Sequence, residues 1–139
     1  MYLLDTNVIS ELRKAGTSRM DRNVRSWAKS VSASTLYLSA ISILELEIGI
    51  LLLERRDRSQ GAVLQAWMDE HVLATFHGRI LAVDTPIALK CATLHVPTPR
   101  SDRDAMIAAT AMVHGMKVVT RNVSHFAPTG VGVVDPWNK

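Results

Sequence analysis

The sequence has 139 residues, the length of one ordinary domain, so we expect a single domain over residues 1–139. Hydrophobic residues make up 47% and charged residues 21%, which are globular values and exclude a disordered chain. The 16 Lys and Arg residues against 13 Asp and Glu residues give a net charge of +3, a mild excess that suits a polyanionic partner but is common in other proteins. The single cysteine, Cys91, excludes an intramolecular disulfide and a cysteine-based zinc cage.

The most apolar segments argue against secretion and membrane insertion. The N-terminus, MYLLDTN, lacks the cationic region and long apolar run of a secretory signal. The apolar stretch AISILELEIGILLL is too short to span a bilayer and contains Glu45 and Glu47, which are costly there. We therefore expect a cytoplasmic protein without a membrane anchor.

The first half of the chain begins with a short buried strand. Tyr2–Leu4 is an apolar run that ends at an aspartate, which predicts this strand. A short helix is expected over 7–14, and a helix over about 20–33 follows from apolar residues at three- and four-residue spacing. Residues 36–38 predict a second strand. Ser42 is expected to begin a helix that is apolar almost all round and therefore deeply buried.

The second half of the chain alternates helices with strands. The expected helices cover residues 59–76, 84–95 and 101–114, and the expected strands cover residues 80–83, 117–120 and 131–134. Pro86 in a first turn and Gly115 after a last turn are typical start and stop signals. Short apolar strands that alternate with helices predict an α/β fold with a small parallel sheet.

Three acidic residues are expected at one edge of this sheet. Asp5 ends the first strand, Glu45 lies in the first turn of the helix after the second strand, and Asp104 lies in the first turn of the helix before the fourth strand. Ligands bind beyond the carboxyl ends of parallel strands. Buried carboxylates that meet there repel one another unless a cation compensates them, and oxygen ligands suit Mg²⁺ or Mn²⁺. The pattern favours metal-assisted attack of water on a phosphodiester.

Each acid also has a purely structural interpretation, which the sequence leaves open. Ser42 with Glu45, and Ser101 with Asp104, both match the spacing of a capping box. Asp5 can cap the helix that follows it. In these interpretations the acids stabilise helix starts and bind nothing.

Four motifs, in this order, carry a family resemblance. They are LLDTNVISELRK, ISILELEIGI, DAMIAATAMVHGMKVVTRNVSHF and GVGVVDPW. With them the chain resembles the PIN-domain ribonucleases, specifically the VapC-type toxins of bacterial toxin–antitoxin pairs, and most closely their FitB/StbB-like branch.

The resemblance implies a PIN-like three-layer fold, in which helices flank a small twisted parallel sheet, and an Mg²⁺- or Mn²⁺-dependent endoribonuclease. Asp5, Glu45 and Asp104 would bind the metal and carry the catalysis. The weaker supporting residues would be Thr6, Asp102, Thr120, Asn122 and His125, and the weaker RNA phosphate contacts Arg100, Arg103 and Arg121. The resemblance also implies a homodimer and a VapB/FitA-like DNA-binding antitoxin, so that DNA is contacted only indirectly.

One position departs from the family pattern. His125 stands in RNVSHF, where the family often has a fourth acid. An imidazole can bind a metal or orient a water, but it supplies no further negative charge for a second Mg²⁺. The departure motivates a second hypothesis, a PIN-like binding or regulatory subunit with little catalysis that docks an antitoxin and aids operator binding. A structure-specific DNA nuclease is a third, but its larger relatives carry helical arches for which this chain is too short.

Overall fold

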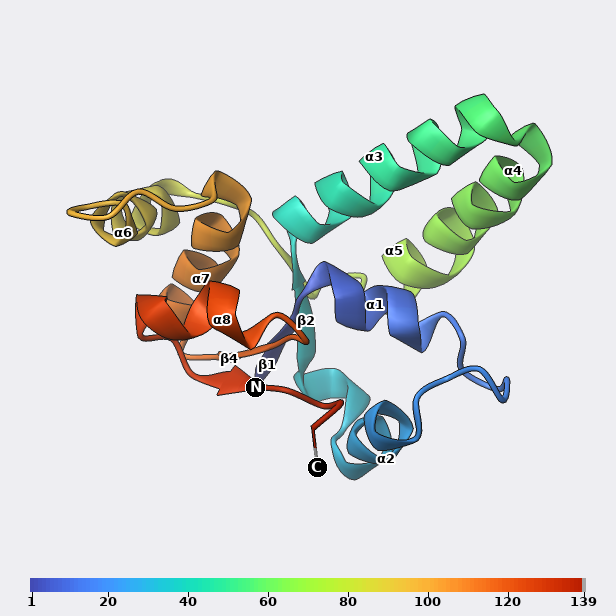
Figure 1. The fold of residues 1–139 in the computed structure, drawn as a ribbon, viewed down its shortest axis with the longest axis horizontal. Coiled ribbons are helices and arrows are strands. Elements are labelled where there is room, and N and C mark those ends of the chain that lie inside the picture. Colours follow the sequence, from blue (N-terminus) through green and yellow to red (C-terminus); the bar gives the residue numbers. More distant parts are fainter. Residues whose placement is uncertain (139) are drawn as a thin grey trace.

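The computed structural model describes residues 1–138 and contains a five-stranded parallel sheet in the order β3-β2-β1-β4-β5 (Figure 1). The strands are β1 (Tyr2–Leu4), β2 (Leu36–Ser39), β3 (Ile80–Leu81), β4 (Lys117–Val119) and β5 (Val133–Val134). Every neighbouring pair of these strands is parallel. The predicted α/β fold with a parallel sheet is confirmed. Because β1 is the central strand, Asp5 follows it at the middle of the sheet edge.

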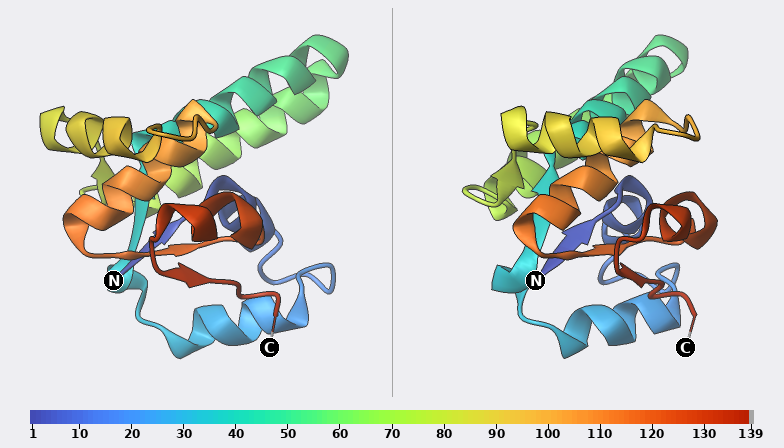
Figure 2. Two further views of the ribbon diagram at one scale, coloured as in Figure 1. Left: turned by 60° about the vertical axis from the view of Figure 1, so that its left-hand side comes forward. Right: turned by 90° about the vertical axis from the view of Figure 1, so that its left-hand side faces the viewer.

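Helices cover both sides of the sheet (Figures 1 and 2). They are α1 (Thr6–Leu12), α2 (Arg22–Ser30), α3 (Ala40–Arg56), α4 (Arg58–Trp67), α5 (Leu73–Thr75), α6 (Thr85–Leu94), α7 (Asp102–His114) and α8 (Val123–Phe126). A π-helical turn, Met68–Val72, joins α4 to α5, so the helix expected over 59–76 is nearly continuous. The helices α3 and α4 form a hairpin that projects from the body of the molecule (Figure 1). No helix within residues 1–138 is long and apolar enough to cross a membrane.

Two hydrophobic clusters lie on opposite faces of the sheet. Leu3 and Val118 belong to the cluster formed with α6 and α7. Leu4 and Val119, the next residues along the same strands, belong to the cluster formed with α1, α3 and the π-helical turn. Successive side chains of a strand point to opposite faces, so each of these short strands contributes to both clusters. The result is a three-layer arrangement of helices, sheet and helices.

The start of α3 differs from the prediction. The helix begins at Ala40, not at Ser42, and Ser39 is its N-cap, whose Oγ accepts a hydrogen bond from the Ile41 N–H at 3.0 Å. Both serines precede an apolar run, so the sequence alone does not choose between them. The Ser42 Oγ is instead buried, and within residues 1–138 it has no hydrogen-bond partner. Glu45 therefore lies in the second turn of the helix.

The prediction that α3 is deeply buried is also wrong. Only one side of the helix reaches the core, through Leu46 and Ile50. Leu44, Leu51 and Leu52 are 46%, 51% and 58% exposed. Apolar residues all round a helix do not reveal whether the chain itself covers every side, and here the projecting hairpin leaves one side of α3 open.

The loop between α1 and α2 is held by a buried acid that the sequence did not single out. The Glu11 side chain accepts hydrogen bonds from the Asp21 N–H at 2.8 Å and from the Lys14 Nζ at 3.1 Å. These contacts, chiefly the one from Asp21, lower the pKa of Glu11 below its ordinary value of 4.5. Asp21 in turn caps α2 by accepting from the Asn23 and Val24 N–H groups.

Candidate active site

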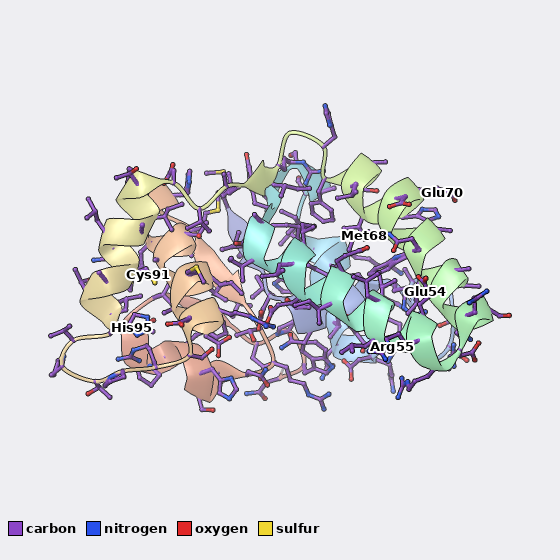
Figure 3. All side chains as sticks on the ribbon, turned by 90° about the horizontal axis from the view of Figure 1, so that it is seen from above. Glu54, Arg55, Met68, Glu70, Cys91 and His95 are labelled. Carbon is purple, nitrogen blue, oxygen red and sulfur yellow. The ribbon has the colours of Figure 1, made fainter. Side chains whose placement is uncertain are left out.

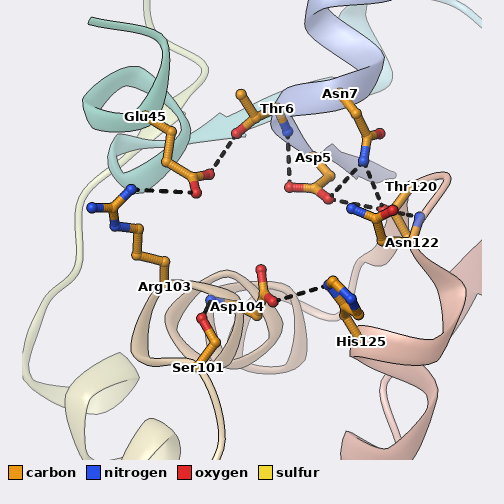
Figure 4. A network of polar contacts seen from close by, with 10 residues as sticks. All are labelled: Asp5, Thr6, Asn7, Glu45, Ser101, Arg103, Asp104, Thr120, Asn122 and His125. Carbon is orange, nitrogen blue, oxygen red and sulfur yellow. Dashed lines mark hydrogen bonds and ion pairs between the residues drawn. The ribbon is translucent and has the colours of Figure 1, made fainter. Parts of the chain in front are cut away.

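Asp5 is both a helix cap and a buried carboxylate at the sheet edge. Its N–H donates to the Val119 carbonyl at 2.9 Å, which continues the pairing of β1 with β4. Its Oδ1 accepts from the Thr6 N–H at 2.8 Å, so the capping interpretation of Asp5 is confirmed. The capping contact occupies one carboxylate oxygen and leaves the other directed at neighbouring polar side chains (Figure 4).

The second oxygen of Asp5 is held by a small polar network. Its Oδ2 accepts from the Thr120 Oγ1 at 2.8 Å and from the Asn7 Nδ2 at 3.3 Å. The Thr120 Oγ1 itself accepts from the Asn122 N–H at 2.9 Å. Because Thr120 is buried at the end of β4 and its hydroxyl oxygen already accepts hydrogen bonds, its proton is directed at Asp5. The network fixes the position of the Asp5 carboxylate.

The charge of Asp5 is unfavourable where it lies. Burial raises the pKa of Asp5 above its ordinary value of 3.8, and this effect exceeds the lowering by the hydrogen bonds from Thr120 and Thr6. The negative charges of Glu45 and Asp104 raise the pKa of Asp5 further. Thus the carboxylates of Glu45 on α3 and Asp104 on α7 lie close enough to repel that of Asp5, which follows β1; Figure 4 shows the three residues together.

Glu45 reaches the site from α3 and is fixed by two contacts. Its Oε1 accepts from the Thr6 Oγ1 at 2.6 Å, and its Oε2 lies 3.8 Å from the Arg103 Nη1. The capping-box interpretation of Glu45 is wrong, since α3 begins before Ser42. The Glu45 carboxylate therefore contacts Thr6 at the sheet edge and does not cap the start of its own helix.

Asp104 reaches the site from the first turn of α7. Ser101 is the N-cap of this helix, and its Oγ accepts from the Asp104 N–H at 3.5 Å. This is half of the expected capping box. The Asp104 carboxylate is directed elsewhere, because its Oδ2 lies 3.3 Å from the His125 Nδ1 of α8.

Two candidate residues lie apart from this group. Asp102 is 86% exposed at its side chain and pairs with the His95 Nε2 at 3.4 Å. The Arg100 Nε donates to the Leu94 carbonyl at 2.6 Å, so this guanidinium holds the loop between α6 and α7. Neither side chain joins the three carboxylates.

Two residues at the site were missed by the sequence analysis. Asn7 contacts Asp5, and its Oδ1 also accepts from the Arg121 N–H at 3.3 Å, so it ties α1 to the end of β4. Its place two residues after Asp5 was the available signal. Trp137 lies under the Arg121 guanidinium, 5.2 Å from ring centroid to Cζ, and nothing in the sequence indicated this pair.

The donor set of the site suits a hard cation. Three carboxylates and the hydroxyls of Thr6 and Thr120 offer only oxygen, the ligand that Mg²⁺ and Mn²⁺ prefer. The side chains are nevertheless engaged with one another: within residues 1–138, no group of three or more His, Cys, Asp or Glu is arranged to hold a metal ion. By composition and charge the residues fit such an ion, which would compete with Thr6 and His125 for carboxylate oxygens.

The PIN-domain family model matches residues 2–127, a range that includes Asp5, Glu45 and Asp104. The chain belongs to this family, which confirms the resemblance seen in its motifs. It is 37% identical to the VapC ribonuclease Y4jK of Sinorhizobium fredii over 142 residues, covering 99% of this chain and 98% of that protein. It is also 37% identical to toxin FitB of Neisseria gonorrhoeae over 144 residues, covering 99% of both. The structure of FitAB bound to a DNA fragment superposes with a TM-score of 0.88 at 35% identity, covering 100% of this chain and 97% of that one.

Proposed function

We propose that this protein is an Mg²⁺- or Mn²⁺-dependent endoribonuclease that acts as the toxin of a type II toxin–antitoxin system. The observation that carries the proposal is the buried Asp5 carboxylate beside Glu45 and Asp104: burial raises the pKa of Asp5, and the two neighbouring negative charges raise it further. Carboxylates that repel one another in a buried place are destabilising unless a cation or a substrate uses them. The names of the relatives, a VapC ribonuclease and a toxin, support the reaction class.

In the proposed mechanism Asp5, Glu45 and Asp104 hold the ion. When bound, Mg²⁺ or Mn²⁺ supplies a Lewis acid that lowers the pKa of water and neutralises charge on the scissile phosphate. The Thr6 and Thr120 hydroxyls keep the Glu45 and Asp5 carboxylates in place. Glu45 orients the attacking water and takes its proton, and no covalent enzyme intermediate forms.

The cationic side chains near the carboxylates have a role with the substrate. Arg103 already lies 3.8 Å from Glu45, and Arg121 follows Thr120 directly at the end of β4. A guanidinium matches the geometry of a phosphate group, so we assign both to RNA phosphates beside the scissile bond. His125 lies opposite Asp104 and, unlike an acid at this position, supplies no further negative charge for a second ion, so the proposal needs only one ion.

A groove that could bind the proposed antitoxin partner lies beside α1, away from the carboxylates. A hollow of about 300 Å³ is lined by apolar side chains that include Ile9, Leu12 and the aromatic rings of Trp67 and Phe76. Its rim carries guanidinium groups over both rings, from Arg13 over Trp67 and from Arg79 over Phe76. An apolar segment flanked by acidic residues would complement this surface. We propose that the antitoxin supplies it and contacts DNA, so that the toxin meets DNA only through its partner.

The exposed apolar side of α3 supports the proposed homodimer. Leu44, Ile48 and Leu51 share one face of the helix by their spacing, and Leu44 and Leu51 are about half exposed. A second copy of the chain would cover them. We further propose that residues 1–139 form a single domain, because both hydrophobic clusters share one sheet. We propose that the protein acts in the cytoplasm, where its RNA substrates are. Light scattering of Leu51→Glu tests the dimer, whose mass should fall to that of a monomer.

RNA cleavage by antitoxin-free protein tests the activity. We expect cleavage with Mg²⁺ or Mn²⁺, none with EDTA, and none for Asp5→Asn, which keeps the size of the side chain but not its charge. Full metal-dependent cleavage by Asp5→Asn would refute the site. A protein that cleaves nothing, yet tightens the binding of its antitoxin to operator DNA, would support the regulatory-subunit hypothesis instead.

A further inference from the structure

The C-terminal segment after β5 lies at the same sheet edge as the end of β4. The two strands pair in parallel, and the Thr120 N–H donates to the Val134 carbonyl at 2.9 Å. Because parallel strands carry their carboxyl ends to one edge, the residues that follow them, Arg121 and the segment 135–138, are neighbours. This segment includes the end of the motif GVGVVDPW, which contributes no residue to the proposed active site.

Trp137 is held in a fixed place within this segment. Its N–H donates to the Asp135 Oδ1 at 2.9 Å, and its carbonyl accepts from the Asn23 Nδ2 of α2 at 2.7 Å. The preceding residue, Pro136, is buried and has a restricted backbone. The half-buried indole packs against the hydrophobic cluster formed with α1 and α3. Figure 2 shows the segment running from β5 toward α2.

Arg121 is held at its backbone and at its guanidinium. Its N–H donates to the Asn7 Oδ1 at 3.3 Å, and the residue before it, Thr120, holds the Asp5 carboxylate. Its Cζ lies over the Trp137 ring, 5.2 Å from the centroid, which is within the range of cation–π attraction. The side chain is exposed, and within residues 1–138 it forms no ion pair. An aromatic ring therefore holds this charge, and no described acid neutralises it.

This pair lies outside both proposed protein contacts. Neither Arg121 nor Trp137 lines the apolar groove proposed for the antitoxin. Seen from above, α3 with Arg55 lies nearest the viewer (Figure 3), whereas the C-terminal segment lies on the underside of the molecule beside α2 (Figure 1). The exposed side of α3, proposed as the contact between two copies, is therefore elsewhere.

We propose that Trp137 is a positioning residue, which holds the Arg121 guanidinium ready for a phosphate of the RNA beside the carboxylates. The inference rests on the proposed endoribonuclease function and deepens the role assigned there to Arg121. An exposed arginine loses rotamer freedom when it binds, and the ring imposes much of that order before the substrate arrives. An indole has a hydrogen-bond donor and no acceptor, so the guanidinium N–H groups stay available for phosphate oxygens.

RNA binding tests the role of the ring. Fluorescence anisotropy with a labelled single-stranded RNA in EDTA gives the Kd without metal-dependent cleavage. Trp137→Leu keeps an apolar side chain but removes the aromatic face, and should raise the Kd about fivefold. Trp137→Phe restores an aromatic face and should stay within about twofold of the unaltered protein. The matched control is Trp27→Leu, which removes a half-buried indole that packs against the same cluster and against Tyr2, and should leave the Kd unchanged.

A double-mutant cycle tests whether Trp137 acts through Arg121. Arg121→Gln alone should weaken binding at least as much as Trp137→Leu, and adding Trp137→Leu to Arg121→Gln should have no further effect. In cleavage assays with Mg²⁺, Trp137→Leu should raise KM about fivefold and change kcat by less than about twofold, because the phosphate contact is made in the bound substrate and kept in the transition state.

The outcomes separate this inference from the proposed function. Additive losses in the double variant, or an equal loss in Trp137→Phe or Trp27→Leu, would show an effect of packing alone and overturn the inference even if the protein cleaves RNA. Coupled losses of binding in a protein that cleaves nothing would support the positioning of Arg121 and overturn the endoribonuclease proposal. An unaltered protein that does not bind RNA overturns both.

Discussion

The helices α3 and α4 approach each other closely at Gly61, and a single methyl group there should separate them. A Cβ at Gly61 would lie 2.6 Å from the Glu54 Cα and 2.7 Å from its Cβ. Restoring 3.4 Å, the lower end of ordinary contact, needs a shift of 0.8 Å between two backbones. Overpacking of this kind costs about 1–3 kcal/mol, and we expect the upper end because backbone cannot move aside as a side chain does. The better helix propensity of alanine returns about 1 kcal/mol.

Gly61→Ala should therefore destabilise the protein by about 2 kcal/mol. With about 2.1 cal/mol/K of unfolding entropy per residue over 139 residues, this lowers the Tm by about 7 °C. Thermal unfolding followed by circular dichroism measures the shift. Gly49→Ala on the same hairpin is the control, since it meets nothing within 4 Å and should raise stability by about 1 kcal/mol. A Gly61→Ala variant as stable as Gly49→Ala would refute the close packing of the hairpin.

Three further predictions concern caps and buried acids. Ser39→Ala should destabilise the protein by about 1 kcal/mol through loss of the N-cap, whereas Ser42→Ala should stabilise it by about 1 kcal/mol by removing an unpaired buried hydroxyl. Urea unfolding of both variants tests which serine begins α3. The opposite order of stability would indicate that the helix begins at Ser42. Glu11→Gln should lower the Tm at pH 7, and the Tm values of the variant and the unaltered protein should become equal well below pH 4.5. The reason is that an acid whose pKa is lowered on folding adds stability above its unfolded pKa and loses that contribution as the pH falls. A Tm difference that is independent of pH would contradict this. In EDTA, Asp5→Asn should raise the Tm at pH 7, because folding raises the pKa of Asp5 and so disfavours its charged form. This gain in Tm should vanish below pH 3.8, where Asp5 is protonated in the folded and the unfolded chain. A lower Tm at pH 7 would show that the hydrogen bonds to Asp5 outweigh the effect of its burial.

The sheet and its acidic edge were accessible from the sequence because they follow from local patterns and one topological rule. Apolar runs marked the strands, and parallel strands carry their carboxyl ends to the same edge, so Asp5 was expected there. The capping role of Asp5 was also readable, and in the structure it coexists with the buried carboxylate.

What the sequence did not reveal depends on contacts between distant segments. Ser39 and Ser42 are equally good caps, and only the end of β2 at Ser39 decides between them. One side of α3 is exposed because the hairpin of α3 and α4 projects from the body of the molecule. The spacing of apolar residues along the helix does not predict this projection. Similarly, Trp137 meets Arg121 only because the C-terminal segment returns past the end of β4.

The central position of β1 has a consequence for synthesis. Tyr2 pairs with Lys117, and the Asp5 carboxylate is held by Thr120, 115 residues further along the chain. Because the chain is synthesised from its N-terminus, β1 is made first but cannot pair with β4 until almost the whole chain has been made. On the ribosome, the Asp5 carboxylate of a nascent chain therefore lacks its Thr120 hydrogen bond, and the acidic sheet edge stays incomplete, until nearly the whole chain has emerged.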